Sequence, residues 1–231
     1  MAIINAPFLV SAIVIGVLGV TSNAYCLTSN ELVNKARSIY YQGKSPLAPQ
    51  AEVNKEKLFA DGLEAAALAR QMEPDNPDAI LWWVNNLSEY SLARGKFYAL
   101  GRIAEIEQGL TDLKALNPQY LSAAADRGLG RLYQLAPPFI SVGDRSKARD
   151  HYEQAIAIAP NFAGNLAYYA DFLDSHGESA KAQELARRVL LSDDLRNFPD
   201  DSLEWTAIAN SILDQPSGIR RGKKINGKGL R

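Results

Sequence analysis

Apolar residues in the second half of the chain recur at the spacing of amphipathic helices. Between residues 145 and 159, Ala148, Tyr152 and Ala155 follow one another at steps of four and three residues. Such steps keep side chains on one face of a helix with 3.6 residues per turn. Pro160 ends this segment, and the next apolar residues at helical steps are Leu166, Tyr169, Ala170 and Leu173. The pattern predicts two consecutive helices that pack against each other.

The same pattern returns after a fixed interval. Four pairs of residues lie 34 positions apart: Gly143 and Gly177, Ala148 and Ala182, Tyr152 and Ala186, and Ala155 and Val189. This is the period of tetratricopeptide repeats, in which each unit is a pair of helices. The small alanines let neighbouring helices approach closely, and Gly177 suits the left-handed turn between two helices. On these residues the chain resembles the tetratricopeptide repeat family.

Helical periodicity extends along most of the remaining chain. Further helices are predicted at about residues 30–41, 52–72, 78–94, 96–116, 119–134 and 201–213. The prolines that end the second helix of each pair lie at positions 74, 118 and 160, at spacings of 44 and 42 residues. The repeats are therefore longer than the usual unit. Part of the extra length lies at 134–142, where Pro137 and Pro138 exclude a helix and favour an extended loop.

These patterns predict an all-α protein, a tetratricopeptide-like solenoid of helical hairpins with expanded repeats and a capping C-terminal helix. We expect the solenoid at residues 52–214, preceded by a short helix and a linker at 25–51. The cap is the helix at 201–213, whose apolar residues are Leu203, Trp205, Ile208 and Ile212. The basic, glycine-rich tail at 215–231 lacks apolar periodicity and is expected to be disordered.

The first 24 residues have the composition of an export segment. Residues 2–20 are almost entirely apolar, and Ser22 and Ala24 suit cleavage after position 24. Three interpretations stay open: a cleaved signal peptide, an uncleaved membrane anchor, or a lipid-modified N-terminus at Cys26. No Lys or Arg precedes the apolar run, and Asn23 and Tyr25 match a lipid-modification motif poorly. All three interpretations predict an exported protein, in the periplasm or attached to the membrane and facing the periplasm.

The charge of the chain is unevenly distributed. The net charge is −1, but the tail from position 215 holds six basic residues and no acid, so the rest carries −1 − 6 = −7. A mildly acidic body gives no reason to expect nucleic acid as a partner, because nucleic-acid binding needs a basic face. The single cysteine cannot form a disulfide within the chain.

Few residues suggest catalytic chemistry. The two histidines, His151 and His176, have no second ligand at metal-binding spacing. No arrangement of nucleophile and base and no glycine-rich phosphate loop is present. The sequence therefore predicts a protein that is not an enzyme, with no metal site and no cofactor.

Stacked helical hairpins expose the inner faces of their first helices as a concave surface, which favours binding. On 78–94 the inner residues are predicted to be Leu81, Asn85 and Ser88. Two registers compete on 119–134. Counting strictly from Pro118 would bury two arginines, whereas a shift of two residues buries the apolar positions Leu129, Gly130 and Tyr133 instead.

The shifted register is preferred, because burying an unpaired charge costs several kcal/mol. It places Arg127 and Arg131 one turn apart on the inner face. With Asn85, they are predicted to form an anion-binding group. The alternative is that the arginines only pair with Asp126 or another neighbouring acid. Such ion pairs are common and contribute little to stability.

Aromatic side chains add a second set of candidates. Trp83 and Tyr169 fall at packing positions and are expected in the core. Trp82 and Tyr168 lie beside the packing stripe and are candidates to line a groove. Phe139, in the loop at 134–142, is expected to pack over an edge of the stack or to line an opening, since an apolar loop is poorly placed in solvent.

A narrower resemblance covers about residues 52–213. The chain resembles the T component family associated with TRAP transporters in the upstream segment around Trp83 and in residues 127–173. The residues that carry the resemblance there are Gly130, Arg131, Tyr133, Pro137, Pro138, Gly143, Asp144, Lys147 and Ala148. The resemblance implies a periplasmic, often lipid-anchored helical protein that forms a homotrimer, has a hydrophobic channel or cleft, and docks a periplasmic solute-binding protein.

Two functions follow. The first is an accessory subunit of a TRAP-type uptake system that binds a protein partner and a small apolar or amphipathic ligand. The second is a generic cell-envelope scaffold that recognises only proteins. An enclosed cavity lined by Trp82, Tyr168 and Phe139 would favour the first function, and an open acidic groove would favour the second.

Overall fold

The computed structural model describes residues 27–45 and 54–214, and within them the chain forms ten helices and no strand. The helices are α1 Ser29–Lys44, α2 Lys55–Met72, α3 Pro77–Ala93, α4 Lys96–Leu116, α5 Ala124–Leu135, α6 Arg145–Ile158, α7 Ala163–Ser175, α8 Ser179–Leu190, α9 Asp194–Asn197 and α10 Pro199–Leu213. The leader at 1–24, Cys26 and the tail at 215–231 lie outside the described residues.

Local sequence determines where several helices begin and end. Thr28 forms a capping box with Glu31 at the start of α1, and Asp144 caps α6 by accepting hydrogen bonds from two backbone N–H groups. Glu73, Asn117 and Ala159 follow the last residues of α2, α4 and α6, and their φ angles of −136°, −154° and −137° are extended. Each precedes a proline, which disfavours the helical conformation in the residue before it.

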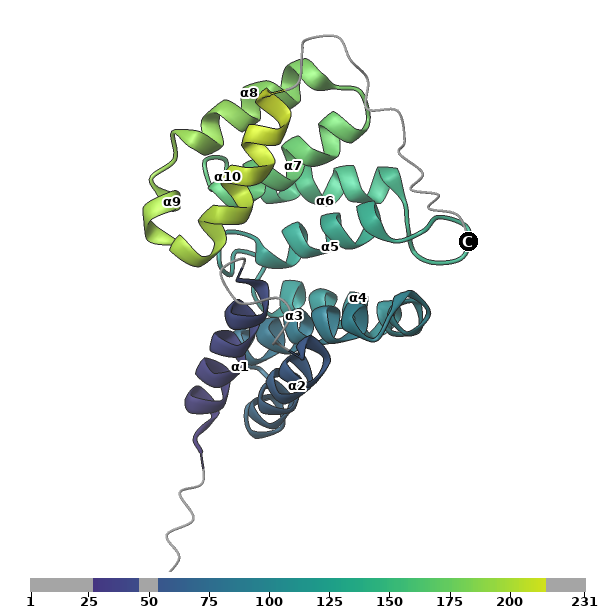
Figure 1. The fold of residues 1–231 in the computed structure, drawn as a ribbon, viewed down its shortest axis with the longest axis vertical. Coiled ribbons are helices and arrows are strands. Elements are labelled where there is room, and N and C mark those ends of the chain that lie inside the picture. The colour runs from purple at the N-terminus through teal and green to yellow at the C-terminus, as the bar shows by residue number, and fades with distance from the viewer. Residues whose placement is uncertain (1–26, 46–53, 215–231) are drawn as a thin grey trace, which may run out of the picture.

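Consecutive helices pack in pairs, as Figure 1 shows. Helix α1 packs on α2, α3 on α4, α5 on α6 and α7 on α8, while α10 covers α7 and α8. The predicted all-α solenoid of helical hairpins with a C-terminal capping helix is confirmed. The helices form an N-terminal half, α1–α4, and a C-terminal half, α5–α10, which are joined mainly where α4 packs on α5.

The core of the C-terminal half contains the residues that the repeat pattern selected. Ala148, Tyr152, Ala155, Ala182, Ala186 and Val189 are all completely buried. Gly177 has a φ of +81°, as the turn between α7 and α8 requires. In the N-terminal half, apolar residues of α1 and α2 form a separate core cluster with Ala79 and Trp82 of α3.

Helix α5 begins at Ala124, five residues later than the sequence predicted. The segment before it turns in the left-handed region, with φ angles of 42°, 57° and 65° at Leu121, Ser122 and Ala123. Left-handed conformations at non-glycine residues are uncommon and are not visible in apolar periodicity. This turn moves the start of the helix, and Leu129, Gly130 and Tyr133 are buried as the shifted register requires.

The loop between α5 and α6 folds back tightly. The backbone N–H of Asp144 donates to the carbonyl of Tyr133, 3.0 Å away. Gly143 lies so close to the Ala136 carbonyl that a Cβ atom there would overlap it. Pro137, Pro138, Phe139 and Ile140 are thereby held at one end of the molecule, on the right in Figure 1.

Candidate functional site

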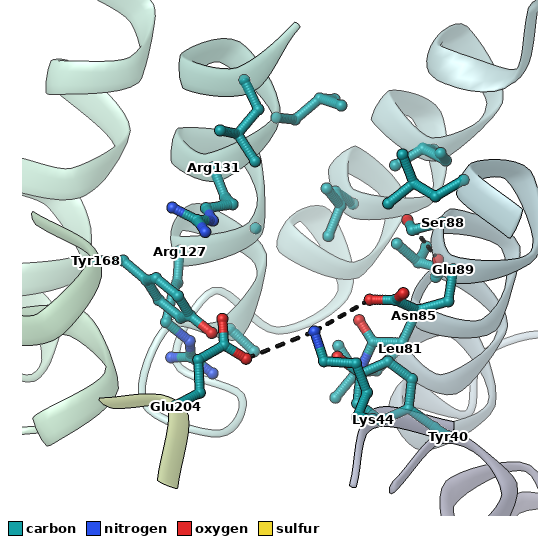
Figure 2. A pocket seen from close by; sticks show the side chains of 18 of the residues that line it. Tyr40, Lys44, Leu81, Asn85, Ser88, Glu89, Arg127, Arg131, Tyr168 and Glu204 are labelled. Atoms are coloured by element: carbon teal, nitrogen blue, oxygen red, sulfur yellow. Dashed lines mark hydrogen bonds and ion pairs between the residues drawn. The ribbon is translucent and has the colours of Figure 1, made fainter. Parts of the chain in front are cut away.

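A cavity of about 1240 Å³ lies between the two halves of the molecule. Residues of α3 and α4 line one side, and residues of α5 with Phe162 and Tyr168 line the other. Figure 2 shows Arg127, Arg131 and Tyr168 facing Leu81 and Asn85 across the cavity. The C-terminal end of α1 and the start of α10 close one end. Small-molecule sites usually have volumes of roughly 300–1,000 Å³, so this cavity has room for a substantial ligand.

Helix α3 presents the face to the cavity that the sequence predicted. Leu81, Asn85 and Ser88 all line it. The neighbouring Asn86 points the other way and is completely buried. Its side-chain N–H groups donate to the carbonyls of Ala36 and Trp82, at 3.1 and 2.8 Å, which fixes α3 against α1. The register of this wall is therefore determined by a buried polar contact as well as by apolar packing.

Helix α5 places Arg127 and Arg131 on the opposite wall, one turn apart, as Figure 2 shows. The two arginines and Asn85 thus lie around one cavity but come from different sides of it. Gly128, Leu132 and Leu135 continue the same wall toward the other end of the cavity.

Arg127 is held by neutral groups rather than by an acid. Its Nη1 donates to the carbonyls of Leu121 and Ser122 and to the side-chain oxygen of Asn165, the last at 2.9 Å. Its guanidinium lies 5.0 Å from the centre of the Phe162 ring. Within residues 27–45 and 54–214, no carboxylate lies within ion-pair distance of Arg127. Burial lowers the pKa of Arg127 from its usual value, because a buried cation loses its hydration.

Arg131 has a different environment. Its Nη1 lies 2.8 Å from the carboxylate of Asp171 on α7, and the guanidinium stacks 5.0 Å from the centre of the Tyr168 ring. Gln134 donates to the same carboxylate at 2.9 Å. Arg131 therefore bridges α5 to α7 through an acid, whereas Arg127 has no direct ion pair at the cavity wall and only the longer-range effect of Asp201.

The acid expected to pair with these arginines lies elsewhere. Asp126 is buried and faces away from the cavity, toward Lys114 at 2.6 Å and the Nδ1 of His151 at 2.7 Å. Burial acts to raise the pKa of Asp126, but the hydrogen bonds from His151 and Lys114 lower it overall. Asp126 therefore pairs with neither arginine, because successive helical positions point to different faces. For Arg131 the alternative of pairing with another neighbouring acid holds, since it pairs with Asp171.

A group of five polar residues, here named the clasp, closes one end of the cavity. It consists of Tyr41, Lys44, Glu89, Asp201 and Glu204. The ammonium of Lys44 lies 3.2 Å from Glu89 on α3 and 3.6 Å from Glu204 on α10, and Figure 2 shows it spanning the gap between them. The Tyr41 hydroxyl donates to Asp201 on α10 at 2.9 Å. The clasp therefore joins the two halves on the side away from the α4–α5 contact.

Burial and neighbouring charges shift the pKa values of ionisable groups in and beside the clasp. Burial raises the pKa of the Asp201 carboxyl, although the hydrogen bond from Tyr41 opposes that shift. Burial also raises the pKa values of the Tyr40 and Tyr168 hydroxyls, so both phenols stay protonated at neutral pH. The pKa of Lys44 is pushed down by burial but raised more by Glu89 and Glu204. This end of the cavity thus offers cations, carboxylates and neutral hydroxyl donors together.

The other end of the cavity is apolar. Side chains from α3, α4, α5 and the α5–α6 loop line it: Leu92, Phe97, Leu100, Ile103, Leu132, Leu135, Pro137 and Ile140. A single cavity therefore has one polar and one apolar end. This arrangement matches a molecule with a polar head and an apolar body.

The aromatic candidates do not all line the cavity. Tyr168 lines the cavity. Trp82 also lines it, although its ring packs against Tyr40 and Tyr41 in the core. The expectation that Phe139 packs over an edge of the stack is wrong, because its side chain is fully exposed, and Phe139 is not part of the cavity lining itself. Its φ of 72° turns the side chain outward, and the next residue, Ile140, lines the cavity instead.

The two aromatic residues expected in the core differ in their burial. Tyr169 is buried in the core, as predicted. Trp83 is only half-buried and lies where the two core clusters meet, with the guanidinium of Arg70 4.5 Å from its ring centre. Periodicity identifies its face but not the basic side chain that covers it.

Neither metal ligation nor membrane crossing is indicated in the part of the chain that the structure describes. His, Cys, Asp and Glu side chains there form no group of three or more suited to a metal ion. None of the helices within 27–45 and 54–214 has the length and hydrophobicity that spanning a bilayer requires.

A family model for the TRAP transporter T-component matches residues 25–208, which is most of the chain. The chain belongs to the T-component family. A search of curated proteins gave no match. Among solved structures, the chain is similar to TTC0263, a thermophilic tetratricopeptide repeat protein of Thermus thermophilus. The identity is 17%, the match covers 80% of this chain and 99% of that one, and the TM-score is 0.44.

Sequence reasoning misses the clasp of this T-component family member. The pattern along the chain places the helix at 30–41 beside a linker and the helix at 201–213 in a cap, so neither is expected to form part of a binding site. Helical periodicity reports local faces and cannot show that Tyr41 meets Asp201. A weak signal exists in the clustering of tyrosines at 40 and 41 beside Lys44, three polar side chains at the end of one helix.

Proposed function

We propose that this chain is a non-enzymatic binding subunit of a TRAP-type solute uptake system. In this proposal it is exported, acts in the periplasm or on the membrane facing it, and docks a periplasmic solute-binding protein. Membership of the T-component family supports the link to transport. The solenoid of helical hairpins supports binding rather than catalysis, since such folds present extended surfaces to partners.

The cavity receives a small apolar or amphipathic molecule. The observation that carries this proposal is the division of one cavity into a polar end and an apolar end. An elongated ligand would place its head near Arg127, Arg131 and Tyr168 and its body between α4 and α5. Asn85 and Trp82 complete the polar part of the lining.

Arg127 is the residue best suited to an anionic head group. It forms no ion pair among the described residues, although the charge of Asp201 acts on it at longer range. The three groups that hold it are neutral oxygen acceptors. A guanidinium matches the two oxygens of a carboxylate, and a partly buried site weakens the screening by water. Arg131 is already paired with Asp171 and contributes less to an incoming anion.

Binding of defined probes to a cavity-filled variant tests the proposal. Asn85→Trp places a large ring in the cavity, whereas Ala157→Trp, on the exposed face of α6, is the matched control. Delipidated protein is titrated with a fluorescent polyene fatty acid, which palmitate then displaces. Wild type and Ala157→Trp are expected to bind the probe, and Asn85→Trp is expected to lose most of the binding with its melting temperature largely kept. Equal binding by all three proteins would contradict a cavity site.

The scaffold function is the alternative. It is favoured by the large apolar side chains exposed around the cavity mouth, which suit a protein surface as well as a ligand entrance. If the cavity does not bind amphiphiles but a purified solute-binding protein forms a complex that Asn85→Trp leaves intact, the scaffold function is the better account. The resemblance also leads us to propose a homotrimer, which sedimentation equilibrium of the purified chain tests directly.

A further inference from the structure

Five large apolar side chains surround the open end of the cavity, and we name this group the lip. Its members come from the α3–α4 turn and from the end of α5 with the loop after it: Leu92, Phe97, Leu135, Phe139 and Ile140. Phe97 and Phe139 are 92% and 102% exposed, and the other three are more than half exposed. Both segments project from the same end of the molecule, on the right in Figure 1.

The lip is not explained by packing within the chain. The other exposed large apolar residues lie singly or in pairs along the chain, such as Leu68 and Met72 on α2, whereas these five lie on two neighbouring projections. The backbone holds Phe139 outward, with a φ of 72° that a non-glycine residue adopts only when its surroundings impose it. The tight Gly143–Ala136 approach closes the base of this loop and so supplies that constraint.

The charge around the lip differs from that of the body. Residues 91–104 contain three basic residues, of which Arg94 lies 3.4 Å from Glu56 and Arg102 lies 2.7 Å from Glu105. Lys96 is the one of these three without an ion pair among the described residues, and residues 134–143 contain no charged side chain. The chain outside the basic tail carries a net −7, so this end, with Lys96 as its unpaired cation, is less acidic than the rest of the protein. Exposed aromatic and aliphatic tips flanked by basic side chains are complementary to an anionic lipid surface.

We propose that the lip inserts into the surface of an anionic lipid bilayer and opens the apolar end of the cavity onto the acyl chains. Four of its five members also line the cavity, so the inserted surface and the ligand site are continuous. A ligand would then leave the bilayer tail-last, with its head moving along the cavity toward Arg127. This step rests on the proposed function, because it supplies the cavity's ligand from a membrane.

A local environmental probe tests the insertion separately from any tether at the N-terminus. In the full chain carrying Cys26→Ser, single cysteines replace Phe97, Phe139 or Leu191 and are labelled with an environment-sensitive dye. Leu191 is the control, since it is an equally exposed apolar residue between α8 and α9. Vesicles contain either phosphatidylcholine alone or phosphatidylcholine with phosphatidylglycerol.

The expected result is a blue shift and an intensity gain at positions 97 and 139 with anionic vesicles, and no change at 191. A shift at all three positions would reflect adsorption or tethering and would overturn the proposal. A shift at 97 and 139 that depends on protein concentration without vesicles, together with a higher mass in sedimentation, would assign the lip to a second copy and equally overturn it. No spectral change at any of the three positions would also overturn the proposal.

Unlabelled variants give a second measurement. Phe97→Ser and Phe139→Ser are each expected to weaken vesicle binding by about tenfold, the usual worth of burying one large apolar side chain. Lys96→Glu is expected to abolish the preference for anionic vesicles, and Arg187→Glu, at an exposed position of α8, is the control. Fatty-acid displacement without vesicles is measured in parallel. If displacement is intact but the lip substitutions leave vesicle binding unchanged, this inference fails and the proposed function stands.

Discussion

The hydroxyl of Tyr41 on α1 donates a 2.9 Å hydrogen bond to the carboxylate of Asp201 on α10, although the two residues are 160 positions apart in the chain. With the Lys44 bridge beside it, this contact joins the first and last long helices across the polar end of the cavity. The solenoid is thus closed on one side at the α4–α5 contact and on the other side by the clasp. The ligand site depends on both.

The stability contributed at Asp201 is expected to depend on pH. Burial raises its pKa in the folded protein above the ordinary value of 3.8, so folding disfavours the ionised form. Below the pKa that Asp201 has in the unfolded chain, its carboxyl is protonated in both states and burying it costs no such stability. The cost grows as the pH rises through the pKa of Asp201 in the folded protein. Asp201→Asn, which keeps an oxygen acceptor for Tyr41, removes this dependence. Denaturant unfolding at pH 4 and pH 7 should show the variant gaining stability relative to wild type at the higher pH, and a constant difference would contradict the assignment.

Arg127 is expected to select anionic amphiphiles. Arg127→Gln removes the charge and should weaken palmitate binding by about 1.5 to 3 kcal/mol, the usual worth of a charge-assisted hydrogen bond. Hexadecanol, with the same chain and no charge, should bind the variant and wild type similarly. The variant also loses hydrogen bonds to the Leu121 and Ser122 carbonyls, so its melting temperature falls and the comparison between the two ligands carries the test. Equal losses for both ligands would mean that Arg127 acts only through the turn.

Arg131 is expected to behave differently because Asp171 already pairs with it. Arg131→Ala should lower stability by about 1 kcal/mol or less, as for other partly exposed ion pairs. Palmitate affinity should change much less than in Arg127→Gln. A paired thermal melt and titration measures both effects. A large loss of palmitate binding with unchanged stability would instead assign the anion site to Arg131.

The repeat register predicts unequal tolerance of two alanines on α8. Ala182 is completely buried against its neighbours, whereas Ala180 is exposed. Ala182→Trp should destabilise the fold by about 1 to 3 kcal/mol or more through overpacking, and Ala180→Trp should change stability little. Thermal melts of the two variants decide the point, and equal losses would mean that the register is wrong.

Much of the C-terminal half could be predicted because its determinants are local. The alanines, tyrosine and glycines of the 34-residue period define both helix faces and the turn at Gly177, and proline explains the end of α6. The cost of burying arginine predicts the two-residue shift in the register of α5, although it does not reveal what in the backbone produces that shift. That cause is the left-handed turn at Leu121, Ser122 and Ala123, which leaves no trace in apolar spacing.

The candidate site could be predicted only in part. The predicted faces of α3 and α5 bring Asn85, Arg127 and Arg131 to the cavity lining, because face follows from periodicity, but periodicity does not show that Asn85 lies on the opposite wall from the two arginines. The orientation of Phe139 depends on backbone dihedrals in an irregular loop, and the clasp depends on contacts between distant helices. The spacing of apolar residues determines neither the orientation of Phe139 nor the contacts of the clasp, so both became visible only in the structure.

Native mass spectrometry of the chain purified from its own cell envelope tests the central claim most directly. Wild type and Asn85→Trp are purified in parallel, and each is analysed before and after collisional activation. Wild type is expected to carry an additional small amphiphile that is released on activation, and the cavity-filled variant is expected to lack it. Wild type of ligand-free mass, or the same bound molecule on both proteins, would contradict a ligand cavity between α3 and α5.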